Sequence, residues 1–248
     1  MSSIQENLSI LNKFKFERKP VGVKFSPTKP HGIKRLDRIL DFCEMLVEAQ
    51  NGKSFYASKK NFTCPIGPLI LGMADSDPIF ESGRVGPKLE IFKDAHANRE
   101  IYEVVPRLAK GTVRYVAFAP LDKLSFEPDV LIITANLSQI EILLRAMSYS
   151  TGKMWSNKGT VVIGCAWLYI YSYLSGESNL TLPSFGMRAR NLFPEGLLPV
   201  SIPWNLIPSV VKNLQEMNWV PHSYTIGREK HKRKVKRIVE GLRQEIDS

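Results

Sequence analysis

Apolar positions recur along the chain with two different periods, and each period predicts its own kind of element. Spacings of three and four residues predict helices over 36–47, 138–149, 204–217 and 228–246. Alternating or continuous runs of β-branched and aromatic residues predict strands over 21–25, 55–58, 113–119, 130–134, 160–164, 180–182 and 198–202. Strands and helices therefore alternate along the chain, without the regular rhythm of βαβ units.

Two further segments adjoin cysteines. Pro65 opens the apolar run 66–73 and is favoured in the first turn of a helix, which places Cys64 at or just before a helix start. Cys165 directly follows the predicted strand 160–164. Tyrosines in 166–174 alternate as in a strand, but the segment's length and the stop at residues 175–176 favour a helix. The motif at 185–190 is predicted to be a loop.

These elements predict an α/β fold: a single domain with a mixed β-sheet flanked by helices, over residues 1–226. The chain has no internal repeat and no long Pro-, Ser- or Gly-rich linker that would force a domain boundary. Residues 227–248 are predicted to form a basic amphipathic C-terminal helix, because one apolar stripe runs through an otherwise charged segment.

The formal charge of +10 is concentrated near the two ends of the chain. Nine basic and two acidic residues lie in 13–38, and eight basic and four acidic residues lie in 228–248. The rest of the chain is close to neutral. Such ends suit a phosphate-rich partner, such as nucleic acid, or an acidic membrane face; they also serve simply to keep the protein in solution.

The cysteine count and the hydropathy favour a cytoplasmic protein. Three scattered cysteines are an odd number and too few for a disulfide framework, which suits a reducing compartment. The N-terminal residues lack the apolar run of a signal peptide. The longest apolar stretch, 161–174, falls short of the roughly 20 residues of a spanning helix, so no transmembrane segment is expected.

Several common catalytic patterns are absent from the sequence. It has neither GxxxxGK[ST] nor GxGxxG, no CxxC pair, and four histidines without metal-ligand spacing. These absences argue against a P-loop enzyme, a dinucleotide-binding Rossmann domain and a thioredoxin-type site. Whether the protein is an enzyme stays open.

The three cysteines are the first candidate site. A thiol acts as a nucleophile or metal ligand in its thiolate form, which a helix N-terminus stabilises. Cys64 and Cys165 are predicted at such positions, and Cys43 lies on the apolar face of the predicted helix 36–47. Three thiolates could hold an iron–sulfur cluster, or a single metal ion, with one open position. Equally, buried cysteines are often small hydrophobic residues without any cofactor.

Two other places could bind an anion. Gly186 lets the backbone turn or approach a ligand, and Arg188 and Arg190 offer forked donors for carboxylate or phosphate. Lys24 is a lone charge in an apolar strand, where it either faces a ligand or points to solvent. A surface turn with a solvated arginine is the simpler interpretation of the first motif.

An ordered set of motifs resembles the uncharacterised archaeal conserved region family, which is domain of unknown function family 169. The matching pieces are Pro20–Lys24, Cys43–Ala49 with Gly52, Cys64–Pro68 with Leu71 and Gly72, Pro128–Val130, Gln139, Cys165, and 176–188 with Asn179. The resemblance runs from about Pro20 to about Trp204 and is specific as an ordered set, although each piece is weak alone.

The resemblance implies a cytoplasmic protein of archaea or anaerobic bacteria, without a settled activity. It also implies that Cys43, Cys64, Cys165, Gly186 and Arg188 belong to one site. Relatives often carry a further cysteine just before the Gly-x-Arg element, where Ser184 and Phe185 stand here. If that cysteine is a fourth ligand elsewhere, this chain holds a three-ligand cluster or none.

Three functions are compatible with these observations. The first is an iron–sulfur or metal protein acting on a small anionic molecule through the three cysteines and Arg188. The second is a metal-free binding module for a small anionic ligand or nucleotide, using Gly186, Arg188 and Lys24. The third is a nucleic-acid-associated protein that works through its basic ends.

Overall fold

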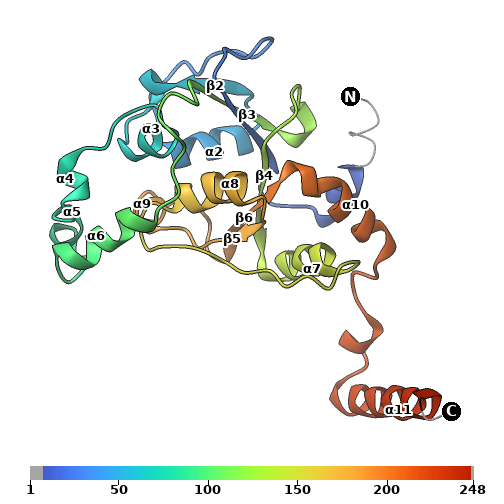
Figure 1. Cartoon of the computed structure of the whole chain (residues 1–248). Coiled ribbons are helices and arrows are strands. Elements are labelled where there is room, and N and C mark those ends of the chain that lie inside the picture. The colour runs from blue at the N-terminus through green and yellow to red at the C-terminus, as the bar shows by residue number, and fades with distance from the viewer. Residues whose placement is uncertain (1–7, 247–248) are drawn as a thin grey trace.

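The computed structural model describes residues 8–246 and is built around one six-stranded sheet (Figure 1). The strand order is β2-β3-β1-β4-β6-β5, and every pair of neighbours is antiparallel. The strands are β1 (Val21–Ser26), β2 (Phe55–Ser58), β3 (Tyr115–Pro120), β4 (Val130–Asn136), β5 (Asn179–Leu180) and β6 (Leu197–Pro203). The predicted α/β class is confirmed; parallel pairing is limited to two isolated bridges.

Helices cover both faces of the sheet (Figure 1). The first face packs against the 3-10 helix η1 (Ser9–Phe14) and the helices α7 (Leu137–Ser148) and α10 (Ile207–Glu216), with η5 (Trp204–Leu206) leading into α10. The second face packs against α2 (Phe42–Gln50), α3 (Ile66–Ile70), the π-helix η4 (Ala166–Tyr171) and α9 (Phe185–Ala189). Strand β4 serves both cores, because Leu131 and Ile133 face the first while Val130 and Ile132 face the second. We call these the helical face and the thiol face.

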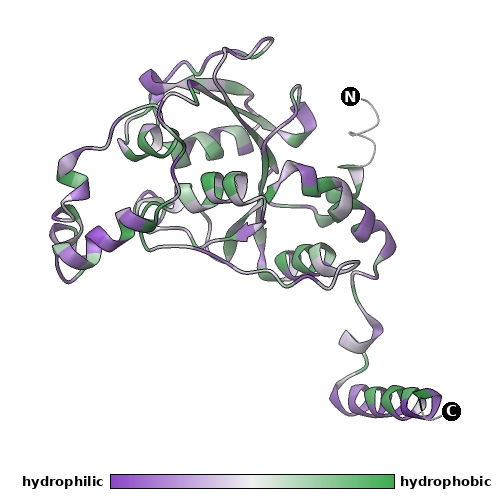
Figure 2. Cartoon of the chain, viewed as in Figure 1, coloured by the Kyte–Doolittle hydropathy of each residue, from purple (hydrophilic) through white to green (hydrophobic). Residues whose placement is uncertain are grey.

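The remaining elements lie around this body. The short helices α4 (Pro78–Glu81) and α5 (Val85–Lys88) form an excursion with α6 (Ala95–Val104), and α8 (Ser172–Ser175) continues η4. The 3-10 turns η2 (Lys59–Asn61), η3 (Leu121–Lys123) and η6 (His222–Tyr224) complete the set. Figure 2 shows hydrophobic residues gathered in the sheet and its covering helices, and hydrophilic residues over the excursion.

The C-terminal helix α11 (Arg228–Ile246) stands away from the body, and none of its residues is buried (Figure 1). The basic helix predicted there is confirmed; residues 1–7 and 247–248 of the predicted ranges lie outside the described part of the chain. Within that part, no helix combines the length and hydropathy that a membrane span requires.

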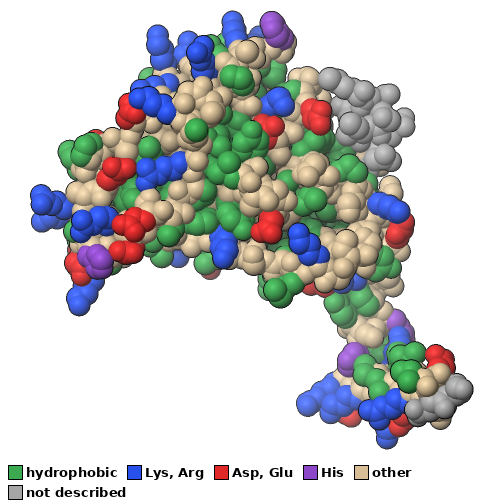
Figure 3. All heavy atoms as spheres, in the orientation of Figure 1, with side chains coloured by type: hydrophobic (Ala, Val, Ile, Leu, Met, Phe, Trp, Pro, Cys, Tyr) green, Lys and Arg blue, Asp and Glu red, His purple; other side chains and the backbone are tan. Residues whose placement is uncertain are grey.

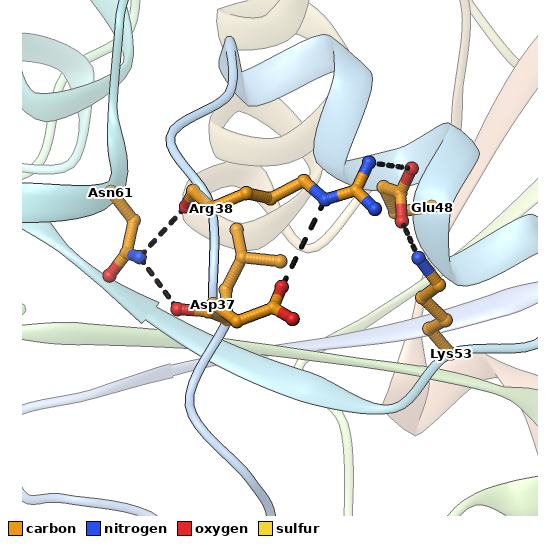
Figure 4. A network of polar contacts seen from close by, with 6 residues as sticks. Asp37, Arg38, Glu48, Lys53 and Asn61 are labelled. Atoms are coloured by element: carbon orange, nitrogen blue, oxygen red, sulfur yellow. Dashed lines mark hydrogen bonds and ion pairs between the residues drawn. The ribbon is translucent and has the colours of Figure 1, made fainter.

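The start of α2 is six residues later than the apolar spacing predicts, and a polar network explains why (Figure 4). The buried Asn61 amide donates hydrogen bonds to the carbonyls of Leu36 (2.9 Å) and Arg38 (3.1 Å). The Arg38 guanidinium in turn pairs with Glu48 of α2 at 3.1 Å. Residues 36–40 are therefore held against η2, and the helix begins only at Phe42.

Two other predictions were wrong. The segment 160–164 is not a strand, because its backbone bends locally. The Thr160 hydroxyl donates to the Val162 carbonyl at 2.5 Å, and Ile163 has a left-handed φ of 56°. The loop predicted at 185–190 contains the short helix α9, which begins directly after Ser184 and buries Met187 in the core of the thiol face.

Candidate thiol site

The three cysteines come together on the thiol face of the sheet. Cys43 is the second residue of α2, Cys64 lies two residues before α3, and Cys165 directly precedes η4. Cys43 and Cys165 are buried members of one core cluster, and Cys64, which is partly exposed, packs against it. Three helix starts thus bring three thiols from distant parts of the chain to one place.

The environment of these thiols keeps them protonated at neutral pH. Burial, followed by the nearby Cys64, raises the pKa of Cys43 to about 12. Burial also raises the pKa of Cys165 well above its ordinary value, and Cys64 and Cys43 raise it further. If two of these thiols ionised, the thiolates would repel each other, because their buried surroundings screen charge weakly. Ionisation of all three thiols therefore needs positive charge close to them.

Some of that compensation is already present around Cys64. Burial raises the pKa of the Cys64 thiol, but the backbone N–H groups of Phe42 and Gly67 lower it. These amides belong to the first turns of α2 and α3, where helix N–H groups have no partner within the helix. The Arg190 guanidinium lowers the pKa of both Cys43 and Cys64, whereas the Asp41 carboxylate raises the pKa of both.

An ion pair with the buried Asp41 holds the exposed Arg190 in this position. The Asp41 carboxylate is 5% exposed, caps α2 and pairs with the guanidinium of Arg190. The Thr63 hydroxyl, next to Cys64, donates a hydrogen bond to the same carboxylate. Arg190 also donates to the carbonyl of Gly186 at 2.8 Å. The pair therefore ties the segment after α9 to the start of α2 and to the Cys64 loop.

Tyr169 adds an unsatisfied polar group to the site. Its ring is fully buried in η4 and stacks on Phe42, with the ring centroids 4.3 Å apart. Its hydroxyl finds no hydrogen-bond partner among the described residues, and Cys43 and Cys165 add to the burial that raises its pKa. An orphaned hydroxyl in a π-helix is uncommon, and π-helical turns are frequent at functional sites.

Ser184 is the buried neighbour of Cys165. A Cβ placed on Gly164, the residue before Cys165, would lie only 2.7 Å from the Ser184 hydroxyl oxygen. A side chain at position 164 would therefore collide with Ser184, and glycine keeps the start of η4 close to α9.

The site is reached through Cys64. A cavity of about 260 Å³ is lined by Cys64 with its neighbours Thr63 and Pro65, by the charged residues Lys59, Asp75 and Asp77, and by apolar residues of α3 and the adjoining segments. Cys43 and Cys165 do not line this cavity. A small molecule that enters it meets one thiol first.

The other predicted site residues lie apart from the thiols. Lys24 is on the opposite face of the sheet, because its strand neighbours Val23 and Phe25 point into the thiol-face core. Its ammonium donates to the Glu127 carbonyl at 2.9 Å and lies 3.7 Å from the Asp129 carboxylate.

The Gly-x-Arg motif reaches the thiols only through Arg190. Arg188 is exposed, and its side chain forms no hydrogen bond or ion pair within residues 8–246. Gly186 contributes its carbonyl to Arg190. The roles predicted for Lys24, Gly186 and Arg188 in binding an anion stay predictions.

Two residues of the site, Asp41 and Tyr169, were not predicted from the sequence, whereas Arg190 was predicted as a donor to an anionic ligand and is found paired with Asp41. Asp41 had a local signal, since aspartate followed three residues later by Glu44 is a capping box, and the Glu44 carboxylate does accept the Asp41 N–H at 2.7 Å. Tyr169 had no such signal, because its place in the site depends on a contact with the distant Phe42.

The thiols do not form a ready site for one metal ion. In the described part of the chain, no group of three or more histidine, cysteine, aspartate or glutamate side chains is arranged to hold an ion. A single ion with metal–sulfur bonds of about 2.3 Å would draw its ligand sulfurs to within roughly 4 Å of one another.

Comparison with protein families gives one match. Residues 9–213 match the model of the uncharacterised ArCR family, domain of unknown function 169. The chain belongs to this family. Searches of curated proteins and of solved structures give no match. All three cysteines and Arg190 lie within the ArCR match, whereas α11 lies beyond it.

Proposed function

We propose that this ArCR protein holds an iron–sulfur cluster through Cys43, Cys64 and Cys165, with one iron left for a small anionic molecule. One observation carries the proposal: three thiols that are far apart in the sequence meet in one core, where they raise one another's pKa. Buried thiolates of like charge are stable together only beside a cation such as iron.

The donor set suits a cluster better than a single ion. Each cysteine of a [4Fe–4S] cluster binds a different iron, so the ligand sulfurs can lie further apart than around one ion. The thiols are close enough to influence each other electrostatically, but they are not arranged around one ion position. When bound, the cluster supplies redox or Lewis-acid chemistry at its open iron.

The surrounding residues have roles that follow from their positions. Arg190 and the N–H groups of Phe42 and Gly67 stabilise negative charge on the thiolates. The Tyr169 hydroxyl, which lacks a partner, is available to donate a hydrogen bond to a sulfur. The cavity beside Cys64 admits a small molecule, and Lys59, Asp75 and Asp77 are the charged residues on its walls.

The proposal includes a cytoplasmic location, because a reducing compartment keeps all three cysteines free of disulfides. In the structure all three are free thiols.

The test is anaerobic purification and reconstitution, followed by iron, sulfide and zinc analysis and a visible spectrum. We expect a coloured protein with iron and sulfide in the wild type, and loss of both in Cys64→Ser. Cys64 is partly exposed, so this isosteric change should leave the fold intact, which circular dichroism checks. Thr112→Ser, a similarly small change in an exposed loop outside the site, is the matched control and should retain the cluster.

Two results would contradict the proposal. One is a wild-type protein that stays colourless and free of iron after anaerobic reconstitution. The other is a folded Cys64→Ser protein that retains the full iron content and spectrum of the wild type.

A further inference from the structure

A second cavity lies across Lys59 from the thiol site, beside the edge strand β2. It measures about 590 Å³, and we call it the basic groove. Six of its lining residues are cationic and none is acidic: Lys29, Arg35, Lys59, Lys60, Lys110 and Arg114. Figure 3 shows Lys and Arg side chains gathered over the end of the molecule that carries β2.

The fold brings these cations together from four segments. Arg35 forms an isolated bridge with Tyr56 of β2, and Lys59 and Lys60 follow that strand directly in η2. Arg114 precedes β3, whose first residue pairs with the last residue of β2. The N–H of Gly111 donates to the Gly72 carbonyl at 2.9 Å, which fixes the Lys110 loop against the end of α3. Ordinary backbone pairing therefore builds a concave positive surface.

Most of this charge is not neutralised by the protein itself. Lys110 is the one member that pairs with a carboxylate among the described residues, with its ammonium 2.7 Å from Asp75. Arg35 donates only to the neutral side chains of Asn61 and Ser58. The side chains of Lys60 and Arg114 form no hydrogen bond or ion pair within residues 8–246. A concave surface lined by one sign of charge concentrates ions of the opposite sign.

The groove also has an aromatic wall. Tyr56 and Tyr115 meet edge to face, with their ring centroids 5.7 Å apart and their planes at 80°. The ammonium of Lys29 lies 5.9 Å from the centre of the Tyr56 ring. An apolar surface between cations suits a ligand that carries a ring as well as negative charge.

We propose that the basic groove binds a small molecule with several linked phosphate groups, such as a nucleoside triphosphate. The six cations line a space whose volume falls within the range of about 300–1,000 Å³ typical of small-molecule sites. A single phosphate reaches only some of those cations, whereas a chain of phosphates contacts several at once. This proposal does not rest on the cluster, although both sites share Lys59.

Single-stranded nucleic acid fits the groove less well. Proteins that bind it without sequence preference combine a charged track along the backbone with a series of aromatic stacking platforms. Here the charge is gathered in one cavity, and its two tyrosines contact each other. We therefore treat RNA binding as an outcome that the experiment must separate.

The experiment is calorimetric titration of the full chain at low ionic strength with inorganic triphosphate, ATP and orthophosphate. We expect triphosphate and ATP to bind at least tenfold more tightly than orthophosphate, with affinity falling as salt is added. Tighter binding of ATP than of triphosphate would identify the source as a nucleotide, and equal binding would identify the phosphate chain alone.

Charge-reversal variants locate the site. Lys60→Glu with Arg114→Glu should weaken triphosphate binding at least tenfold, since neither side chain has a structural partner. The matched control, Lys88→Glu with Lys153→Glu, makes the same charge change at exposed positions outside the groove and should have a small effect. Cys64→Ser should bind triphosphate as the wild type does, so failure of the cluster proposal leaves this one standing.

Three outcomes would overturn the proposal. The first is absence of triphosphate and ATP binding at low salt. The second is an equal loss of affinity in the two double variants, which would mean attraction by overall charge. The third is binding of single-stranded RNA alone, with no response to either triphosphate ligand.

Discussion

The two faces of the sheet are built in different ways. On the helical face, regular helices meet an apolar core, and buried polar side chains there are paired: the Asn213 amide donates to the Ala146 carbonyl at 2.8 Å. On the thiol face, one of the covering helices is a π-helix, Ile163 has a left-handed backbone and the Tyr169 hydroxyl has no partner among the described residues. Local irregularity of this kind is concentrated at functional sites in many proteins, so the comparison supports a site on the thiol face and a mainly structural role for the helical face.

The largest effect should come from the helical face. Leu143→Ala removes a fully buried side chain and should lower the free energy of unfolding by about 2–5 kcal/mol, measured by urea denaturation. Leu137→Ala, on the same helix but 73% exposed, is the control and should change it little. Neither variant should lower the iron content of the folded protein. Loss of iron in folded Leu143→Ala would mean that the two faces are not separable.

An intermediate effect should appear at alkaline pH in the metal-free protein. The Cys43 thiol ionises at its ordinary pKa of 9.0 when unfolded, and at about 12 when folded. The unfolded state therefore releases the proton first, and the stability contributed by Cys43 is lost as the pH rises from 9.0 to about 12. The slope from one such group is at most ~1.4 kcal/mol per pH unit.

Comparison with variants isolates that slope. Cys43→Ala should flatten the decline of the unfolding free energy above pH 9.0, whereas Leu143→Ala should shift the curve down without changing its slope. Identical slopes in the wild type and Cys43→Ala would contradict the assignment to this thiol.

The smallest effect should come from Tyr169→Phe in the metal-free protein. The change removes an unpaired buried hydroxyl and keeps the ring on Phe42, so stability should stay level or rise by up to about 1 kcal/mol, measured by thermal or urea unfolding. Tyr171→Phe, which loses a hydrogen bond to Glu177 at 3.0 Å, is the control and should not gain stability. A clear loss in Tyr169→Phe would show that its hydroxyl is satisfied.

Local patterns predicted helices and strands correctly where the periodicity of the apolar residues and the turn residues at the ends of the segment were both clear. The strand at 55–58 and the helix at 228–246 have the predicted bounds, and proline at position 65 correctly indicated a helix start. The strand predicted at 160–164 was wrong, because the Thr160 hydroxyl donates to the Val162 carbonyl of the same segment. The edge strand of the sheet is β5 instead. The late start of α2 depends on Asn61. Because Asn61 lies outside residues 36–47, the spacing of apolar residues in that range does not indicate it.

The site was predictable only in part, because it too depends on contacts between segments that are distant in the sequence. Two of the cysteines were placed at helix starts by local rules, and the structure brings all three together. The Asp41–Arg190 pair joins the first and last thirds of the chain, and the basic groove is assembled from four segments. Such contacts are properties of the folded chain and leave no local pattern.

The close fit of Ser184 against the residue before Cys165 has an evolutionary consequence. Serine and cysteine differ by one atom, oxygen in place of sulfur, and Ser184 is already buried at the border of the thiol group. A single substitution, Ser184→Cys, would thus place a fourth thiol against Gly164, the residue before Cys165. Chains with three and with four thiols in this core would then differ in the identity of one buried atom.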